Sequence, residues 1–185
     1  MNIFFLDYSP AICAELHCDK HVCKMIIEYA QLLSTAHRVL DGELYIAKTA
    51  NGRNIKRWRL ADKDMERNLY KASFVNHPSA VWVRDSVDNY GYLVQLWYNL
   101  SHEYEHRYGK KHATYVKLKD YLGLIPLAMC RSEHPERGLE VPQCMPDDVK
   151  DSNDFIKAYH QYYRKYKRDF ARWTKRPTPE FMEVA

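Results

Sequence analysis

Near the N-terminus, acidic, basic and imidazole side chains recur at spacings of three and four residues. These residues are His17, His21, Lys24, Glu28, Gln31 and Thr35. In a helix, such spacings align the side chains on one face. A carboxylate held beside a cation and imidazoles can have the shifted pKa values that proton transfer requires. The stripe therefore predicts one wall of an active site, with a buried salt bridge between Lys24 and Glu28 as the structural alternative.

A second candidate site follows from the stretch HEYEHRYGKKH, which begins at His102. It matches the HExxHxxGxxH zinc signature of metzincin peptidases letter for letter. On a helix His102 and His106 would face one way, and a turn at Gly109 would return His112 as the third ligand. Zinc is therefore the alternative cofactor, and a metallopeptidase-like hydrolase is the alternative enzyme. This hypothesis ranks second, because such peptidases have uncharged residues where this chain has Glu105.

The stripe also contains a family motif. Asp19 and His21 are two residues apart, Glu28 follows the histidine by seven residues, and Lys24 precedes the glutamate by four. Further along come a His-Pro-x-x-x-Trp, a Tyr-Gly and an Arg-x-Gly. They consist of His77, Pro78 and Trp82, then Tyr90 and Gly91, then Arg107 and Gly109. Over roughly residues 11–112 the chain resembles the pyrimidine dimer DNA glycosylase/AP lyases of the phage endonuclease V type, and especially their bacterial relatives.

This resemblance implies a DNA repair enzyme that flips a nucleotide out of the stack and attacks C1′ with an amine, forming a Schiff base. It implies that Glu28 stabilises the sugar cation and moves protons, and that His21 contacts a phosphate. In the family the amine belongs to a small residue exposed by removal of the initiator methionine. Here the second residue is the bulky Asn2, so the amine is assigned to Met1. Lys24 is the further candidate, as a phosphate ligand, because an unperturbed lysine is charged at physiological pH whereas an α-amine is substantially neutral.

The expected partner is DNA with a flipped or damaged nucleotide, and the resemblance implies no cofactor and no protein partner. Two arginines that the family places beside its catalytic glutamate are Ile27 and Gln31 here. Other residues must therefore supply part of the contact with DNA. The candidate substrate-binding residues are His17, Gln31, His77, Arg84, Arg164 and Arg168.

Basic residues cluster on two further predicted surfaces. The last predicted helix, residues 154–175, carries on its polar face Arg164, Lys165, Lys167, Arg168, Arg172 and Lys175. The second arm of a predicted hairpin carries Arg53, Lys56, Arg57 and Arg59. Such surfaces favour phosphate binding that weakens with salt, although an ordinary solvated face has the same composition. A nucleic-acid or nucleotide-binding module without catalysis is therefore the non-enzymatic alternative.

The element that must position the stripe is a helix over residues 17–38, where nearly every other side chain is apolar. A helix that is apolar almost all round is a buried helix. Ser9 and Pro10 predict that it starts near residue 11, and Gly42 predicts its end. The hairpin is expected over residues 43–60, around its Asn-Gly turn.

The remaining pattern predicts a single, mainly α domain with that hairpin as its one sizeable β element. Further helices are expected over residues 62–74 and 79–108. A basic, aromatic stretch covers 110–121, and a proline-rich irregular segment packed across the helices covers 122–153. The chain has 185 residues, of which 46% are hydrophobic and 28% charged. It is therefore long enough for one core and too apolar for a disordered chain.

Cysteine usage and the N-terminal sequence bear on the expected location. The five cysteines are an odd number, and the first three are spaced by five residues. This favours free thiols and a reducing compartment over a disulfide scaffold or CxxC zinc ligation. The start, MNIFFLDYSP, lacks the basic region of a signal peptide, and no stretch is long enough to span a bilayer. We expect a cytoplasmic protein of a bacterium or of an infected bacterial host.

Overall fold

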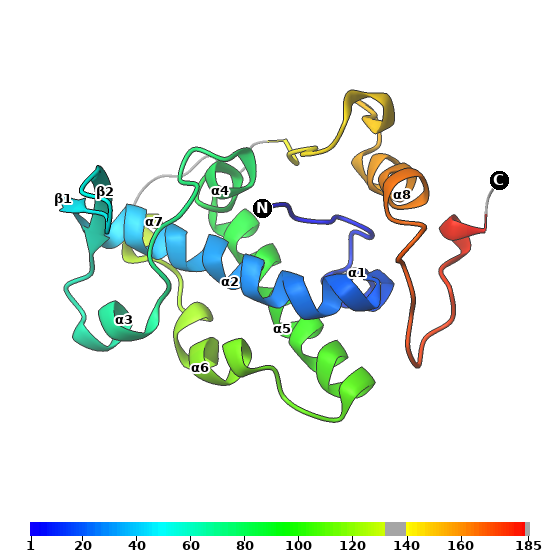
Figure 1. The fold of residues 1–185 in the computed structure, drawn as a ribbon, viewed down its shortest axis with the longest axis horizontal. Coiled ribbons are helices and arrows are strands. Elements are labelled where there is room, and N and C mark those ends of the chain that lie inside the picture. Colours follow the sequence, from blue (N-terminus) through cyan, green and yellow to red (C-terminus); the bar gives the residue numbers. More distant parts are fainter. Residues whose placement is uncertain (132–139, 184–185) are drawn as a thin grey trace.

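One long helix, α2, runs through the middle of a mainly helical fold (Figure 1) in the computed structural model, which describes residues 1–131 and 140–183. The expected fold class, mainly α with a small β-hairpin, is confirmed. The helices are α1 (Pro10–Leu16), α2 (Asp19–Asp41), α3 (Lys63–Asn68), α4 (Pro78–Val83), α5 (Val87–Tyr108), α6 (Ala113–Leu122), α7 (Leu127–Arg131) and α8 (Phe155–Tyr166). The strands are β1 (Glu43–Lys48) and β2 (Asn54–Arg59), and the 3-10 turns are η1 (Asp147–Val149) and η2 (Glu180–Met182).

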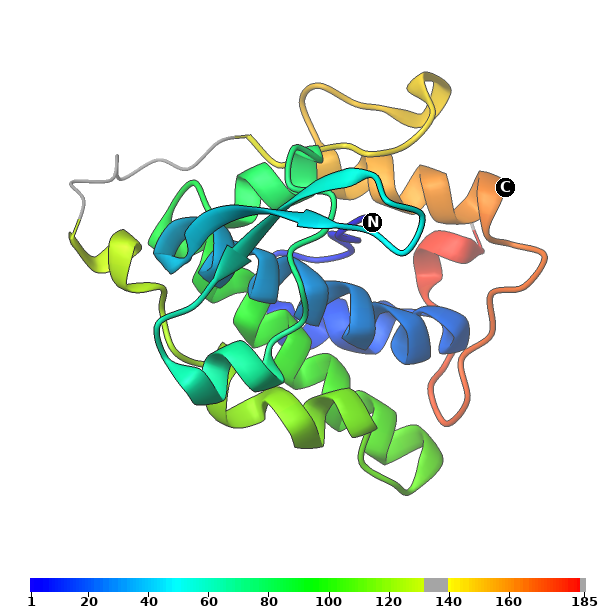
Figure 2. The same cartoon turned by 60° about the vertical axis from the view of Figure 1, so that its left-hand side comes forward.

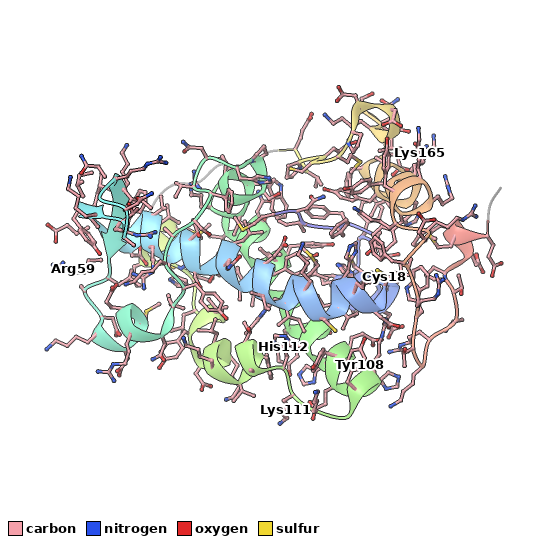
Figure 3. The ribbon with its side chains drawn as sticks, viewed as in Figure 1. Cys18, Arg59, Tyr108, Lys111, His112 and Lys165 are labelled. Carbon is pink, nitrogen blue, oxygen red and sulfur yellow. The ribbon has the colours of Figure 1, made fainter. Side chains whose placement is uncertain are left out.

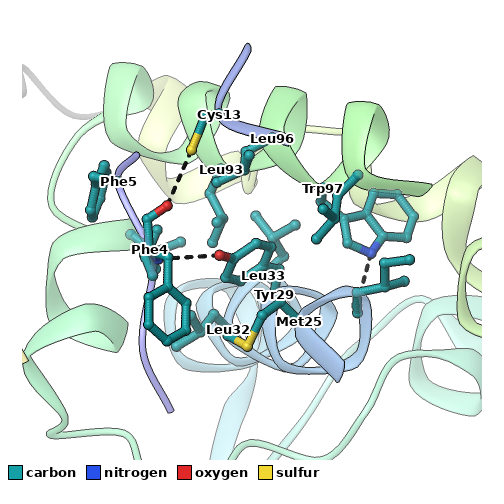
Figure 4. Packing of buried hydrophobic residues seen from close by; sticks show 14 of the residues in the cluster. Phe4, Phe5, Cys13, Met25, Tyr29, Leu32, Leu33, Leu93, Leu96 and Trp97 are labelled. Atoms are coloured by element: carbon teal, nitrogen blue, oxygen red, sulfur yellow. Dashed lines mark hydrogen bonds between the residues drawn. The ribbon is translucent and has the colours of Figure 1, made fainter. Parts of the chain in front are cut away.

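The central helix is buried, as its apolar pattern predicts. Met25, Ile26 and Leu33 are each 2% exposed or less. Helix α5 packs against them, and the Trp97 indole N–H donates to the Ile26 carbonyl at 3.0 Å (Figure 4). Burying one large apolar side chain contributes roughly 1.5–3 kcal/mol. The contact between α2 and α5 is therefore the centre of the core.

The predicted continuous helix from residue 11 to residue 38 is wrong at one point, because it breaks at His17 and Cys18. Both residues have an extended backbone. The Asp19 N–H then donates to the Arg172 carbonyl at 2.8 Å instead of to a carbonyl one turn earlier. A tertiary contact from the C-terminal segment therefore outweighs the local propensity to continue the helix.

The expected helix over residues 79–108 is also divided, into α4 and α5. Ser86 has an extended backbone, and its hydroxyl accepts the Asn89 N–H at 3.1 Å, which starts α5 as a new helix. The predicted end is confirmed, since Gly109 adopts the left-handed conformation that terminates helices, with φ 68°. The expected helix over residues 62–74 is shorter than predicted, because only α3 is helical there.

The C-terminal part departs most from the prediction. Residues 154–175 contain α8, which ends at Tyr166, and the chain then turns so that a later carbonyl reaches the start of α2. The basic, aromatic stretch 110–121, where no helix was expected, contains most of α6. The segment 122–153 is only partly irregular, since it contains α7 and η1, and its residues 132–139 lie outside the described residues.

The hairpin over residues 43–60 is confirmed, with β1 and β2 paired antiparallel. Gly52 in its turn has φ 79°, a conformation that glycine adopts without strain. Gly42 is needed for a different reason, because a Cβ at this position would overlap the Arg38 carbonyl and touch the Trp58 side chain. The hairpin can therefore lie close against the end of α2 (Figure 2).

Arg38 joins the hairpin and α3 to α2 from inside the core. Its fully buried guanidinium donates to the Glu66 carboxylate at 2.5 Å and also to backbone carbonyls. These carbonyls belong to Trp58, Glu66, Leu69 and Tyr70. A buried charge is tolerated when it is paired and its N–H groups are hydrogen-bonded. Sequence periodicity gave no indication of this residue.

The cysteines and the helix lengths agree with two further expectations. All five cysteines are free thiols, and burial raises the pKa of Cys13 to about 11, which makes this thiol unreactive. Among the helices that the structure describes, none is both long enough and apolar enough to cross a bilayer.

Candidate active site at the N-terminus

The N-terminal residues form an extended segment that crosses α2 on the side of α4 and α8 (Figure 1). Residues 3–6 are buried. The Cys13 thiol donates to the Phe4 carbonyl at 3.1 Å, and the Phe4 N–H donates to the Tyr29 hydroxyl at 3.2 Å (Figure 4). Because these contacts fix a segment that has no helix or strand of its own, the amine of Met1 has a defined position.

His17 contacts two of the groups that hold this segment. Its Nδ1 lies 2.7 Å from the Cys13 carbonyl and must donate to it, so its Nε2 accepts from the Tyr29 hydroxyl at 2.9 Å. The same hydroxyl oxygen accepts the Phe4 N–H. Burial lowers the pKa of His17 to about 4, and the ring is neutral at pH 7. The ring is fully buried and positions the N-terminal segment, and a substrate contact at His17 stays a prediction.

His21 is also turned inward. Its ring stacks on that of Phe4, with centroids 4.2 Å apart, and its Nδ1 lies 2.5 Å from the Tyr163 hydroxyl. Burial, followed by the positive charges nearby, lowers the pKa of His21 to about 2. A neutral ring that is 7% exposed has no charge to offer a phosphate. Its observed contacts again hold the N-terminal segment.

Asn2 anchors the chain directly beside the amine. Its amide N–H donates to the Cys144 carbonyl at 3.0 Å, and its Oδ1 accepts from the Tyr159 hydroxyl at 3.0 Å. The two partners come from the segment before η1 and from α8. From the sequence Asn2 matters only for its bulk, but in the fold its two hydrogen bonds orient Met1.

The charges of Met1 and Glu28 both act on the imidazole of His77. Burial lowers the pKa of His77, the Met1 ammonium lowers it further, and the Glu28 carboxylate raises it. Salt screens the interaction of exposed charges beyond about 10 Å, so the amine and the carboxylate lie in the neighbourhood of the His77 imidazole. The His77 Nδ1 accepts the Ser79 N–H at 3.2 Å, which leaves Nε2 to carry the proton of the neutral ring.

Glu28 is accessible at this site. It forms the predicted ion pair with Lys24 at 3.1 Å, but the Lys24 side chain is 70% exposed and that of Glu28 16% exposed. The structural alternative of a buried salt bridge therefore does not hold for Lys24, whereas Glu28 is partly buried. A pair with one partner in water contributes about 0–1 kcal/mol, so the fold does not depend on Glu28. Gln31, one turn further along α2, is half-buried.

The three candidate arginines Arg84, Arg164 and Arg168 all donate to backbone carbonyls. Their acceptors are the carbonyls of Val75 and Ala80, of Phe181, and of Met182, respectively. Burial lowers the pKa of Arg84, and this side chain fastens the segment before α4 to that helix. Arg164 and Arg168 hold η2 against α8. All three side chains therefore stabilise the fold, in addition to the DNA contacts that were predicted for them.

The histidines of the zinc motif make separate aromatic contacts. His102 packs against Tyr98 and Tyr115, with ring centroids 4.4 and 5.6 Å apart. His112, at the start of α6 (Figure 3), accepts the N–H of the residue two positions on and packs against Tyr104 at 4.9 Å. Among the described residues no three His, Cys, Asp or Glu side chains are grouped as metal ligands. Zinc at this motif stays a prediction for metal analysis.

A cluster of ion pairs that helical periodicity does not predict fixes the start of α2. Arg107 donates to Asp19 at 2.8 Å and to Glu103 at 2.6 Å, and Arg176 donates to Glu103 at 2.8 Å. Burial opposes ionisation, but these hydrogen bonds outweigh it and lower the pKa of both Asp19 and Glu103. Asp19 and Arg107 belong to the same family motif, which is the sequence signal that links them.

We compared the chain with protein-family models, with curated proteins and with solved structures, and found no match in any of the three comparisons. The arguments for a function therefore come from the motif residues and from the geometry around Met1, Glu28 and His77.

Proposed function

We propose that the protein is a DNA N-glycosylase/AP lyase of the pyrimidine dimer type, with the Met1 amine as nucleophile and Glu28 as the catalytic carboxylate. The observation that supports this proposal is the convergence of amine, carboxylate and imidazole from residues 1, 28 and 77. An amine nucleophile needs a proton-transfer group within reach. It must also be held in place, and the buried contacts of Phe4 and Asn2 hold it.

The proposed reaction uses the Met1 amine in its neutral form, whose nitrogen lone pair is the nucleophile. The amine nitrogen attacks C1′ of a flipped deoxyribose, the bond from C1′ to the base breaks, and the base leaves with the electron pair and is protonated. The nitrogen then loses a proton, the C1′–O4′ bond of the sugar ring breaks and O4′ takes up a proton, which leaves C1′ and the nitrogen joined as a Schiff base. Glu28 stabilises the positive charge that develops on the sugar. It then accepts the C2′ proton, so that the 3′ phosphate leaves by β-elimination.

The neighbouring residues fit supporting roles. Lys24 is largely in solvent, where its ammonium can exchange the Glu28 carboxylate for a DNA phosphate. His77 offers its Nε2–H as a hydrogen-bond donor beside the amine. A neutral His77 also adds no further positive charge near the amine.

Borohydride trapping on duplex DNA with one abasic site tests the proposal. The wild-type protein should form a covalent adduct with the DNA, and peptide mass analysis should locate the adduct on the Met1 amine. Protein acetylated at this amine should form no adduct. The Lys24→Gln variant should bind DNA more weakly but give an adduct at the same place, because its side chain is not the nucleophile.

Each other outcome favours a different function. DNA binding without an adduct would favour the non-catalytic module, and an adduct through Lys24 would move the nucleophile. Metal analysis of the same preparation tests the peptidase alternative. About one zinc per chain, lost on substitution of His102, His106 and His112, would support that alternative over the glycosylase.

A further inference from the structure

A groove lies between β2 and the segment that connects α3 to α4. Its volume of about 520 Å³ falls within the range of about 300–1,000 Å³ that is typical of small-ligand sites. Cations and aromatic rings occur together in its lining, which includes Lys56, Arg57, Trp58, Phe74 and Asn76. Proteins that bind single-stranded nucleic acid combine these two kinds of side chain.

Phe74 is held open to solvent on a fixed backbone. Its side chain is 69% exposed, and its φ of 48° is rare for a bulky residue. The Ser73 N–H donates to the Thr35 hydroxyl of α2 at 3.2 Å, and the Phe74 carbonyl accepts the His77 N–H at 2.8 Å. Residues kept in strained conformations cluster at ligand-binding sites. The exposure of this ring on a strained backbone therefore indicates that it contacts a ligand.

The cations of the groove lack acidic partners. Within the described part of the chain, no carboxylate forms an ion pair with Arg53, Lys56, Arg57 or Arg59. Arg57 ties β2 to the connecting segment by donating to the Ala72 carbonyl at 3.2 Å. Lys56 is exposed, and Arg59 lies at the end of the same strand (Figure 3). This positive charge complements a phosphodiester backbone.

We infer that this groove binds an unpaired nucleotide of a DNA strand, with its base stacked on Phe74 and its flanking phosphates at Lys56 and Arg57. The inference rests on the proposed function. The turn from Phe74 to His77 joins the groove to the imidazole on which the charges of Met1 and Glu28 act, so a strand in the groove would run towards the reacting nucleotide. Because every base has a π-face, stacking of this kind tolerates many sequences.

The Phe74→Gly variant gives the sharpest test, because it removes the ring and also relieves the strain of a positive φ. Its thermal midpoint should be no lower than that of the wild type. Its affinity for a fluorescently labelled single-stranded oligonucleotide, measured by anisotropy, should fall about 5- to 150-fold, the loss expected for one stacked base. Phe74→Trp should restore the affinity. Tyr98→Ala, which removes another exposed ring, is the matched control and should bind like the wild type.

The phosphate contact at Lys56 can be tested separately, through the salt dependence of binding. Lys56→Gln should reduce the salt dependence of single-strand binding by about 0.7 in the slope of log K against log salt. Lys63→Gln removes an exposed lysine of α3 as the control and should leave the slope unchanged.

The outcomes separate this inference from the proposed function. If the wild type is trapped on abasic DNA while Phe74→Gly binds the oligonucleotide undiminished, the groove assignment is wrong and the lyase stands. If Phe74→Gly weakens binding of the oligonucleotide while the wild type forms no covalent adduct with abasic DNA, the groove assignment stands and the lyase proposal fails. Tighter binding of an RNA strand of the same sequence would overturn the assignment to DNA.

Discussion

The guanidinium of Arg107 lies 2.8 Å from the carboxylate of Asp19, a residue 88 positions earlier in the chain. Asp19 also accepts the Thr174 N–H at 3.0 Å, so one side chain joins α5 and the C-terminal segment to the first turn of α2. A carboxylate at this end of a helix also interacts favourably with the helix dipole. Asp19 therefore sets the position of α2, and with it that of Glu28.

Replacing Arg107 with alanine should destabilise the protein by about 3–5 kcal/mol, because it leaves the buried Glu103 carboxylate with one partner fewer. Urea unfolding measures this change. Arg67→Ala is the control, since its pair with Asp64 is exposed and 3.7 Å long, and it should cost at most about 1 kcal/mol. A stable Arg107→Ala protein that has lost lyase activity would instead place Arg107 in the reaction.

Replacing Glu28 with glutamine should separate catalysis from folding. Because Lys24 is largely in solvent, the free energy of unfolding should change by about 1 kcal/mol or less. Single-turnover cleavage of abasic DNA should slow by about 10²- to 10⁴-fold, the usual effect of losing a general base. Borohydride trapping should persist, since the nucleophile is intact. Full cleavage activity in this variant, with exposed Glu43→Gln as the control, would remove Glu28 from the mechanism.

Replacing Asn2 with alanine should make the position of the Met1 amine less well fixed. The variant loses two hydrogen bonds, each worth about 0.5–1.5 kcal/mol. Misplacement of a reacting group by a small distance can reduce a rate about 100-fold, so the trapping rate should fall by about 10- to 100-fold while DNA affinity stays the same. Asn153→Ala, at an exposed position, serves as the control. An unchanged trapping rate would show that this anchor is not needed.

The buried histidines should make the protein sensitive to mild acid. The unfolded His17 imidazole takes up a proton near pH 6.5, whereas the folded one does so only near pH 4, because burial lowers its pKa to about 4. Stability is therefore complete above pH 6.5 and is lost as the pH falls from there towards 4. The loss from His17 is roughly 3 kcal/mol, at about 1.4 kcal/mol per pKa unit.

Urea unfolding at several pH values checks this prediction. His17→Gln should be less stable at pH 7 and should show a shallower loss between pH 6.5 and 4. Substitution of the exposed His106 by glutamine should leave the pH dependence as in the wild type. An equally steep loss in both variants would contradict the assignment to His17.

The basic face formed by the end of α8 and the residues that follow it should contribute to DNA binding through its charge. Replacing Arg164, Arg168 and Arg172 with glutamine should flatten the salt dependence of duplex binding by about 0.9 for each phosphate that these side chains neutralise in the wild type. Two of these residues also hold carbonyls of η2, so thermal unfolding must be measured alongside. An unchanged salt slope together with a lower unfolding temperature would show that these arginines stabilise the C-terminal segment and do not contact DNA. Exposed Lys119→Gln is the matched control.

Local signals predicted much of the fold. The apolar pattern of residues 17–38 predicted the burial of α2, and the Asn-Gly pair predicted the hairpin turn, because both depend on residues close together in sequence. The breaks at His17 and Ser86 escaped prediction. One depends on a carbonyl from Arg172 and the other on a cap inside a continuous periodic pattern, and neither changes the spacing of apolar residues.

The sequence by itself determined the residue types at the candidate site and the helical spacing that puts Glu28 one turn from Lys24. Only the tertiary structure decided which members of the stripe face inward. His17 and His21 turn into the core because the N-terminal segment and α8 cover that part of α2. Glu28 stays partly exposed, and its charge and that of Met1 both act on His77. Helical spacing fixes the face on which a side chain lies, whereas the elements that cover this face are chosen by burial of apolar surface between distant segments.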